Sequence, residues 1–370
     1  MNSLKKKILI ITTVTAPGGV DTYILTLTRE AKRRNWMINV LMDNNKGSDR
    51  LFKKLTNENI FVRRKGLYHK LNGNALIKER TLLTIEEFNP NIIHVVCGSP
   101  KSALGPREVA IEKNIPLFFT ETYVNPFFNF DKKTYHRIKR VYQCAKKVIT
   151  MGDENKYLLI NKYGFPKNKI IAIQNSVKVP QKEDIKKLCI KNKYRLLSIG
   201  RFVNQKGFDI LIKAISLLEN IIKEKIHLTI IGEGPDLKFL QKLVFKNKLE
   251  NYISFTGWED DLEKRMTNYD LFIIPSRFEG QPFALLEAMS YGIPSIATNV
   301  SGIPEALGKG QYGYLIPPND PIALAYYIEK FINNPNDLFQ KAKNGINGIR
   351  LQHNIEKNFD ILFNLWEKEL

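Results

Sequence analysis

The chain has 370 residues, of which 43% are hydrophobic, so it is long enough for two domains with full cores and too apolar for a disordered protein. It carries 57 Lys and Arg against 37 Asp and Glu, and the net charge of +20 predicts a surface that attracts nucleotides, acidic polymers or anionic lipid. The 3 cysteines form no CxxC or Cys/His cluster, which argues against a disulfide framework and a zinc site and favours the reducing cytoplasm. No apolar run reaches the ~20 residues needed to cross a bilayer, and the N-terminus lacks the cleavage site of a signal peptide.

The first half of the chain alternates apolar runs with amphipathic segments. Residues 7–12 are predicted to form a buried strand that leads into a glycine loop containing Gly18 and Gly19, and an amphipathic helix is expected at residues 21–33. A second helix is expected at residues 76–88. Further strands are expected at residues 37–42, 60–63, 91–98, 117–122, 148–151 and 170–173. This alternation predicts a doubly wound α/β domain.

A lysine-rich segment at residues 174–194 interrupts the alternation and is interpreted as a domain linker. Beyond it, strands are expected at residues 195–199, 227–231 and 253–255, and helices at residues 208–220 and 236–247. The chain is expected to be helical from residue 321, and its last amphipathic segment contains Trp366. We predict an α/β protein with two Rossmann-like domains, residues 1–180 and 181–350, that face each other across a cleft. The final helix, residues 351–370, is expected to return to the first domain.

Residues 271–305 contain the most specific pattern in the chain. An apolar run ends at Pro275, Gly280 frees the backbone to approach a ligand, and Pro282 suits the first turn of a helix. A helix that starts beyond the carboxyl end of a strand readily binds anions at its N-terminus. A buried Glu287 in this helix would need hydrogen-bond donors such as sugar hydroxyls. Taken alone, however, Glu279 and Glu287 each fit an ordinary solvated charge.

Arg201 and Lys206 lie between an expected strand and helix, in a segment with a glycine at each end, Gly200 and Gly207. Two cations five residues apart can converge on one phosphate group. The segment is not a Walker loop, because no Ser or Thr follows a Gly-Lys pair, and by itself it also fits a basic, solvated turn. The similar strand-end turn Gly232-Glu233-Gly234 is a weak signal alone.

Several short motifs follow one another in a defined order along the chain. They are Gly18-Gly19, Gly200-Arg201 with Lys206-Gly207, Gly232-Glu233-Gly234, Phe255-Thr256-Gly257, Pro275-Ser276, Glu279-Gly280 with Glu287-Ala288, and Gly302-Ile303-Pro304-Glu305. In this order they resemble the retaining glycosyltransferases of family 4, which have the GT-B fold. The match is dense between residues 195 and 318, whereas the first half matches mainly in layout.

The resemblance implies a retaining, metal-independent hexosyltransferase that has no cofactor and uses a UDP-sugar or GDP-sugar as donor, with UDP favoured. It implies that Arg201 and Lys206 hold the donor diphosphate and stabilise the leaving group. It also implies that Glu287 binds the ribose hydroxyls and that Glu279 lies near the transferred sugar. The remaining donor-binding residues that it implies are Gly18, Gly19, Gly232, Glu233, Trp258, Gly280, Gln281, Phe283, Ala284 and Leu285. The acceptor is expected to be a hydroxyl of a lipid-linked glycan or a bacterial surface polysaccharide.

One departure from the family concerns the end of the strand at residues 117–122. Many family members have a histidine there, but this chain has Glu121, which is expected to bond a sugar hydroxyl, take a proton from the acceptor or stabilise an ion pair. His94 lies one strand earlier, where the family often has a histidine of its own. Two interpretations of His94 stay open, a catalytic residue and a hydrogen-bonded core histidine.

Residues 127–147 combine basic and aromatic side chains. Phe127, Phe128 and Phe130 precede a helix-forming segment with seven cations, namely Lys132, Lys133, Arg137, Lys139, Arg140, Lys146 and Lys147. Basic residues beside exposed aromatic residues hold proteins on anionic lipid, at about 1 kcal/mol per cation. The alternative is a solvated helix packed on the sheet. The overall charge favours attachment to a membrane surface, at the cytoplasmic face of the cell membrane.

Three other functions fit parts of the pattern. A nucleotide-sugar epimerase of the same fold would hydrolyse and re-add within one site, but such enzymes are usually not basic. A phosphorylase would need a cofactor lysine and a longer chain. An anion-binding or nucleic-acid-binding protein would explain the charge, but it would leave the pattern around Glu279 and Glu287 without a role. We therefore expect no nucleic acid partner.

Overall fold

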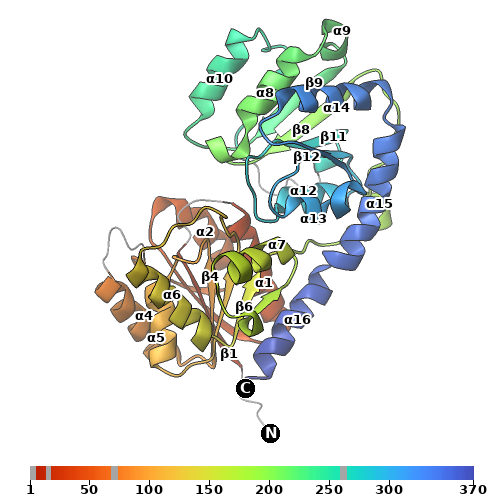
Figure 1. Cartoon of the computed structure of the whole chain (residues 1–370). Coiled ribbons are helices and arrows are strands. Elements are labelled where there is room, and N and C mark those ends of the chain that lie inside the picture. The colour runs from red at the N-terminus through yellow and green to blue at the C-terminus, as the bar shows by residue number, and fades with distance from the viewer. Residues whose placement is uncertain (1–5, 14–17, 68–73, 259–264) are drawn as a thin grey trace. The chain divides into compact units, whose positions relative to one another are not determined.

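The computed structural model describes residues 6–13, 18–67, 74–258 and 265–370. It divides into unit 1, which is Met1–Asn175 with Glu356–Leu370, and unit 2, which is Ser176–Ile355. Each unit contains one parallel sheet with helices on both of its faces (Figure 1). The chain first passes from unit 1 to unit 2 after residue 175, whereas the sequence predicts this domain boundary after residue 180.

Unit 1 is built on a 7-stranded parallel sheet in the order β3-β2-β1-β4-β5-β6-β7. Aliphatic residues fill β1 and β4, because strands of a parallel sheet are covered on both faces. The strands are β1 (Lys7–Thr12), β2 (Met37–Met42), β3 (Phe61–Arg64), β4 (Ile92–Cys97), β5 (Leu117–Glu121), β6 (Lys147–Thr150) and β7 (Ile170–Ala172). The helices are α1 (Gly19–Arg33), α2 (Asp49–Asn57), α4 (Asn74–Phe88), α5 (Leu104–Glu112), α6 (Lys132–Cys144), α7 (Asp153–Tyr157) and α16 (Ile355–Glu367).

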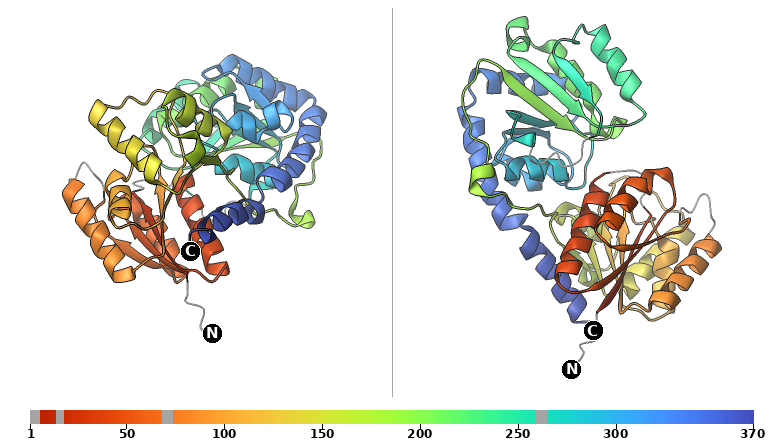
Figure 2. Two further views of the ribbon diagram at one scale, coloured as in Figure 1. Left: turned by 60° about the horizontal axis from the view of Figure 1, so that its bottom comes forward. Right: turned by 180° about the vertical axis from the view of Figure 1, so that it is seen from behind.

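The last helix, α16, packs on unit 1 through a row of aromatic side chains. Phe359 stacks on Tyr23 of α1, and the Trp366 ring lies 5.3 Å from the His94 ring of β4. Trp366 is fully buried. Both views in Figure 2 place this helix, the blue end of the ribbon, beside the red N-terminal part of the chain. The expected return of the final helix to the first domain is confirmed.

Unit 2 is built on a 6-stranded parallel sheet in the order β10-β9-β8-β11-β12-β13. The strands are β8 (Tyr194–Ile199), β9 (Ile226–Ile231), β10 (Ile253–Thr256), β11 (Leu271–Ile274), β12 (Ser295–Thr298) and β13 (Tyr314–Ile316). The helices are α8 (Phe208–Leu217), α9 (Asn220–Lys223), α10 (Leu237–Lys246), α12 (Phe283–Ser290), α13 (Ile303–Ala306), α14 (Pro321–Asn333) and α15 (Asn336–Gln352). Side chains from α8, α10 and α14 form one core against this sheet.

Two details of unit 2 differ from the sequence analysis. The helix expected at residues 208–220 is divided into α8 and α9, because Leu218 and Glu219 take extended backbone conformations. The strand β13, which is 3 residues long, was not predicted.

The strand order of each sheet contains one switch point, between β1 and β4 in unit 1 and between β8 and β11 in unit 2. In open α/β sheets, ligands bind beyond the carboxyl ends of the strands at such a point. In unit 2 the carboxyl end of β8 leads into residues 200–207, named here the β8 loop. The carboxyl end of β11 leads into residues 275–282, named the β11 loop. The topology therefore brings the two most specific sequence motifs to one edge of one sheet.

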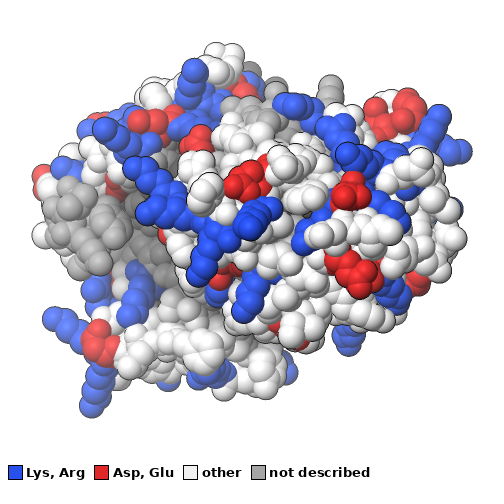
Figure 3. Space-filling view, turned by 90° about the horizontal axis from the view of Figure 1, so that it is seen from above, with Lys and Arg blue, Asp and Glu red and all other residues white. Residues whose placement is uncertain are grey.

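On the face shown in Figure 3, Lys and Arg side chains are distributed widely, with Asp and Glu side chains between them. Within the described ranges, no helix has both the length and the apolar character that a membrane span requires.

Candidate functional site

The β8 and β11 loops of unit 2 pack closely together, and a glycine makes this possible. Gly207 has a φ of +65°, and a Cβ added there would lie 2.1 Å from the carbonyl oxygen of Pro275. Only glycine fits this position, because it tolerates the left-handed conformation and has no Cβ. Gly207 is therefore needed for the contact between the β8 loop and the β11 loop.

Lys206 and Glu279 form the centre of the site. The Lys206 Nζ donates a hydrogen bond to Glu279 Oε1 at 2.5 Å, and the Ser276 hydroxyl donates to the same oxygen at 2.7 Å. The stem of Lys206 crosses Gly200, where its side-chain carbons lie 3.3 Å from the position of an added Cβ. Glu279 is only 6% exposed, so these two donors compensate the burial of its charge.

Arg201 lies on the same loop as Lys206 and is half-buried. Among the residues that the structure describes, its side chain has no hydrogen bond and no ion pair. A half-buried guanidinium at the carboxyl edge of a sheet leaves its donors available to an anion. This geometry suits the phosphate-binding role expected for Arg201.

The loop after β9 adjoins the β8 loop. A Cβ on Gly232, whose φ is +156°, would lie 1.9 Å from the carbonyl oxygen of Gly200. The Phe202 main-chain N–H donates to the Glu233 carbonyl oxygen at 2.7 Å, and the Trp258 main-chain N–H donates to the Glu233 carboxylate at 3.4 Å. The structure therefore brings Gly232, Glu233 and Trp258 next to the β8 loop, and the donor-binding role that the resemblance implies for them stays a prediction.

The helix α12 begins at Phe283, directly after the β11 loop. Its N-cap residue, Pro282, makes no side-chain hydrogen bond to the first turn. Gly280 accepts a hydrogen bond from the Gly302 N–H at 3.0 Å, which fixes the loop before the helix. Gln281, Phe283 and Leu285 are buried, and Ala284 is half-buried.

Glu287 is half-buried, whereas Glu279 is buried. From the sequence, burial was expected for Glu287, within the helix, and not for Glu279 in the loop before it. The structure shows the opposite order of burial, because the loop turns Glu279 inward to Lys206 and Ser276.

Gly18 and Gly19 lie in unit 1, where Gly18 precedes α1 and Gly19 is its first residue. The Gly18 carbonyl accepts a hydrogen bond from the Asp21 N–H at 3.0 Å. Both glycines follow β1, one of the two strands at the switch point of that sheet. Their position fits a backbone that approaches a ligand at the carboxyl edge of unit 1.

Glu121 does not face solvent at the end of β5. Its side chain is fully buried and pairs with fully buried Arg107 at 3.3 Å, and the Tyr142 hydroxyl donates to it at 2.8 Å. Burial raises the pKa of Glu121, although the Arg107 charge and these hydrogen bonds oppose the shift. This geometry argues for a structural role of Glu121 and against the expected contact with a sugar or an acceptor.

His94 is fully buried in the middle of β4. Its Nε2 lies 2.9 Å from the Thr120 hydroxyl, and its ring contacts Trp366. Burial lowers the pKa of His94 to about 3, so the ring is neutral at physiological pH. Of the two interpretations left open, these contacts favour the core histidine.

The basic segment at residues 127–147 is less exposed than expected. Phe127 is 86% exposed, but Phe128 and Phe130 are half-buried against Tyr163. Arg137 pairs with Glu108, and Lys146 pairs with Glu369. The expectation of three exposed aromatic residues is wrong, because the loop before α6 folds back onto Tyr163. Of the three phenylalanines and seven cations named for this segment, those that stay exposed are Phe127, Lys132, Lys133, Arg140 and Lys146.

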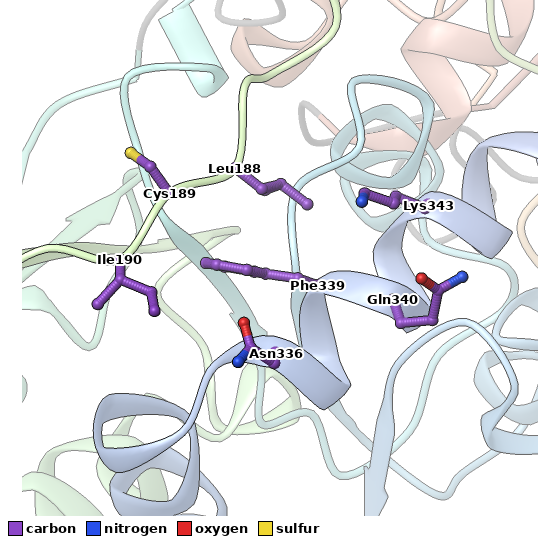
Figure 4. A pocket seen from close by; sticks show the side chains of 7 residues that line it. All are labelled: Leu188, Cys189, Ile190, Asn336, Phe339, Gln340 and Lys343. Atoms are coloured by element: carbon purple, nitrogen blue, oxygen red, sulfur yellow. The ribbon is translucent and has the colours of Figure 1, made fainter.

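A groove of about 430 Å³ lies elsewhere in unit 2, between the segment before β8 and helix α15 (Figure 4). Its lining residues are Leu188, Cys189, Ile190, Asn336, Phe339, Gln340 and Lys343. None of these is a predicted site residue, so the groove is separate from the edge that carries Lys206 and Glu279.

Several residues that organise the site had no clear sequence signal. Ser276 was visible only as part of a motif, and Arg277, Asp209 and Arg107 were not predicted at all. Arg277 and Asp209 are 68 positions apart in the chain, so no local spacing could have paired them.

Among the described residues, no group of three or more His, Cys, Asp and Glu side chains could hold a metal ion.

The two halves of the chain match two related families. Residues 180–348 match the family described as Glycosyl transferases group 1, and residues 17–179 match Glycosyltransferase Family 4. The chain therefore belongs to the glycosyltransferases of the group 1 and family 4 type.

Relatives and solved structures agree with this assignment. An uncharacterized glycosyltransferase of Haemophilus influenzae is 25% identical over 340 residues, which is 90% of this chain and 92% of the relative. The UDP-Gal:alpha-D-GlcNAc-diphosphoundecaprenol alpha-1,3-galactosyltransferase of Escherichia coli is 28% identical over 229 residues, 56% of each chain. The structure of Anabaena Alr3699/HepE in complex with UDP and glucose superposes with a TM-score of 0.81 at 20% identity, over 97% of this chain and 99% of that one. The expected GT-B fold is confirmed.

Proposed function

We propose that the chain is a retaining hexosyltransferase that transfers a sugar from a nucleoside diphosphate donor to a hydroxyl of a lipid-linked glycan or bacterial surface polysaccharide. UDP is favoured over GDP as the carrier. The observation that carries the proposal is the pair of cations on the β8 loop, half-buried Arg201 without a partner among the described residues and Lys206 beside Glu279. A developing diphosphate charge at this edge would be stabilised by these cations, so the reaction is proposed to need no metal ion.

The named relatives support the donor and acceptor classes. The Escherichia coli relative is a UDP-galactose transferase that acts on a diphosphoundecaprenol glycan, and the Anabaena protein was crystallised with UDP. Other relatives are named for colanic acid and amylovoran biosynthesis. These names favour a role in bacterial surface polysaccharide synthesis.

Nucleotide binding tests the proposal directly. The purified chain is titrated with UDP, GDP and a short oligonucleotide in separate calorimetric experiments, at equal ionic strength. We expect saturable binding of UDP, weaker binding of GDP and no saturable binding of the oligonucleotide. Incubation with a panel of UDP-hexoses and extracted lipid-linked glycans, followed by mass analysis, then identifies the product. Conversion of the donor sugar to its epimer without transfer would contradict the proposal.

We propose further that an exposed part of unit 1 attaches the enzyme to an anionic membrane surface at the cytoplasmic face. Phe127 is 86% exposed, and the Lys162 Nζ lies 5.4 Å from its ring. Lys132 and Lys133 at the start of α6 are exposed and close to it in sequence. An exposed aromatic ring beside several cations is typical of proteins that bind at the interface of anionic bilayers.

Vesicle flotation tests this attachment. Vesicles of phosphatidylglycerol and phosphatidylcholine are expected to carry the wild type, and high salt or pure phosphatidylcholine to release it. The triple variant Phe127→Ser, Lys132→Glu, Lys133→Glu should stay unbound. The control is Ile322→Ser, Lys309→Glu, Lys343→Glu, which replaces one exposed apolar residue and two exposed lysines of unit 2 by the same residue types. Equal flotation of the two variants would exclude this surface.

A further inference from the structure

Arg277, in the β11 loop, reaches across to the β8 loop and to the start of α8. Its Nη1 donates to the Asn204 carbonyl oxygen at 2.7 Å and to Asp209 Oδ1 at 2.8 Å, and its Nη2 donates to Asp209 Oδ2 at 2.7 Å. A bidentate pair of this kind fixes both the position and the plane of a guanidinium group. Partial burial acts to raise the pKa of Asp209, but the hydrogen bonds and charge of Arg277 hold it below its ordinary value.

The contacts around Arg277 join the two loops residue by residue. The Arg277 main-chain N–H donates to the Gln205 carbonyl oxygen at 2.8 Å, and the Gln205 Nε2 donates to the Phe278 carbonyl oxygen at 3.1 Å. The next pair along is Lys206 with Glu279. Lys206 therefore directly follows two residues that are bonded to the β11 loop. The Arg277 side chain makes the bond to Asn204, and its main chain makes the bond to Gln205.

We propose that Arg277 is a positioning residue, which with Asp209 holds the β8 loop in the arrangement that presents Arg201 and Lys206 to the donor diphosphate. The inference rests on the proposed function of this edge of unit 2. The guanidinium of Arg277 is engaged by Asn204 and Asp209, so it acts through the loop and does not bind the donor itself. The side chains of Arg277 and Asp209 are 20% and 27% exposed, and neither residue belongs to the hydrophobic core of unit 2.

Calorimetric titration with UDP measures the effect of Arg277 on binding. We expect Arg277→Ala to weaken UDP binding about tenfold, the size expected for lost hydrogen bonds between charged groups. Arg277→Lys keeps the charge without the bidentate geometry and should weaken binding less. Asp209→Asn should weaken it as well. The control is Arg195→Ala, which removes an arginine from the amino end of β8, at the opposite edge of the sheet.

Two further measurements separate positioning from direct contact. If Arg277 touched phosphate, its removal would reduce the salt dependence of UDP binding; for a positioning residue the salt dependence stays that of the wild type, whereas Lys206→Met reduces it. Amide hydrogen exchange at residues 205–207 without ligand should be faster in Arg277→Ala than in Arg195→Ala. Wild-type UDP affinity or unchanged exchange in Arg277→Ala would overturn the inference. Failure of the wild type to bind UDP or GDP would instead refute the proposed function, and the exchange data would still decide whether Arg277 holds the loop.

Discussion

Arg107 of α5 and Glu121 of β5 form an ion pair in which both side chains are fully buried. The Arg107 guanidinium also donates to the carbonyl oxygens of Pro100 and Ser102, in the segment that follows β4. Buried charges are tolerated only where partners satisfy them, and here one arginine satisfies a carboxylate and two main-chain carbonyls. The pair therefore fixes the segment after β4, at the carboxyl edge of the unit 1 sheet.

Arg107→Met should lower the free energy of unfolding by about 3–5 kcal/mol, because it leaves the Glu121 carboxylate buried without its charged partner. Urea unfolding monitored by circular dichroism measures this loss. The double variant Arg107→Met, Glu121→Met removes both charges and should recover part of it. A single variant as stable as the wild type would mean that the pair contributes nothing to the fold.

Glu121→Gln should change how stability depends on pH. Burial raises the pKa of Glu121 in the folded protein above its ordinary value of 4.5, so the folded state holds this proton more tightly than the unfolded chain does. The resulting stabilisation is fully present below the unfolded pKa and is lost as pH rises through the folded pKa. The difference in unfolding free energy between wild type and variant should therefore fall from about pH 4 upward, as urea titrations at several pH values would measure. Exposed Glu250→Gln is the control, and a difference that does not vary with pH contradicts the assignment.

Gly207→Ala should disturb the contact between the β8 and β11 loops. The left-handed conformation alone costs a non-glycine residue about 1–2 kcal/mol, and the clash with Pro275 adds to this. We expect a clear loss of stability and at least a tenfold loss of UDP affinity, measured by urea unfolding and calorimetry. Gly257→Ala, whose added Cβ would be 3.9 Å from Glu233, should change both quantities little. Equal behaviour of the two variants would argue against a special role for Gly207.

Lys206→Ala should lower kcat roughly 100-fold, because it removes a cation that stabilises the leaving diphosphate. Steady-state kinetics with the donor found in the screen measures this loss, and exposed Lys213→Ala on α8 is the control. A wild-type kcat in Lys206→Ala would show that the site is assigned wrongly.

Glu287→Ala should act mainly on donor binding. Loss of an acceptor for the ribose hydroxyls is expected to raise the donor KM about tenfold and to change kcat less. The same kinetic assay compares it with Glu250→Ala, an exposed glutamate of the same unit. A lowered kcat at unchanged KM would place Glu287 at the reacting sugar instead.

The sequence predicted most strands of both sheets, since parallel strands covered on both faces appear as continuous apolar runs. It also predicted the loops that carry Arg201, Lys206 and Glu279, because glycine and proline mark the ends of those strands. Partnerships between distant residues could not be predicted. Arg107 and Glu121 meet only after α5 packs on β5, and Arg277 finds Asp209 only after β8 and β11 become neighbours. Likewise, the relative burial of Glu279 and Glu287 depends on how the β11 loop turns, which no periodic pattern records.

The position of α16 has a consequence for how the chain matures during synthesis. Unit 1 begins with the first strand, yet fully buried Trp366, which covers His94, belongs to it as well. Domains generally fold as they leave the ribosome, in order from the N-terminus. Here the residues of unit 2 emerge complete while the core of unit 1 still lacks its last helix. Unit 1 is therefore translated first, but its core is completed last. A nascent chain that stops before residue 366 would expose the apolar surface that α16 covers, and chaperones recognise such surfaces.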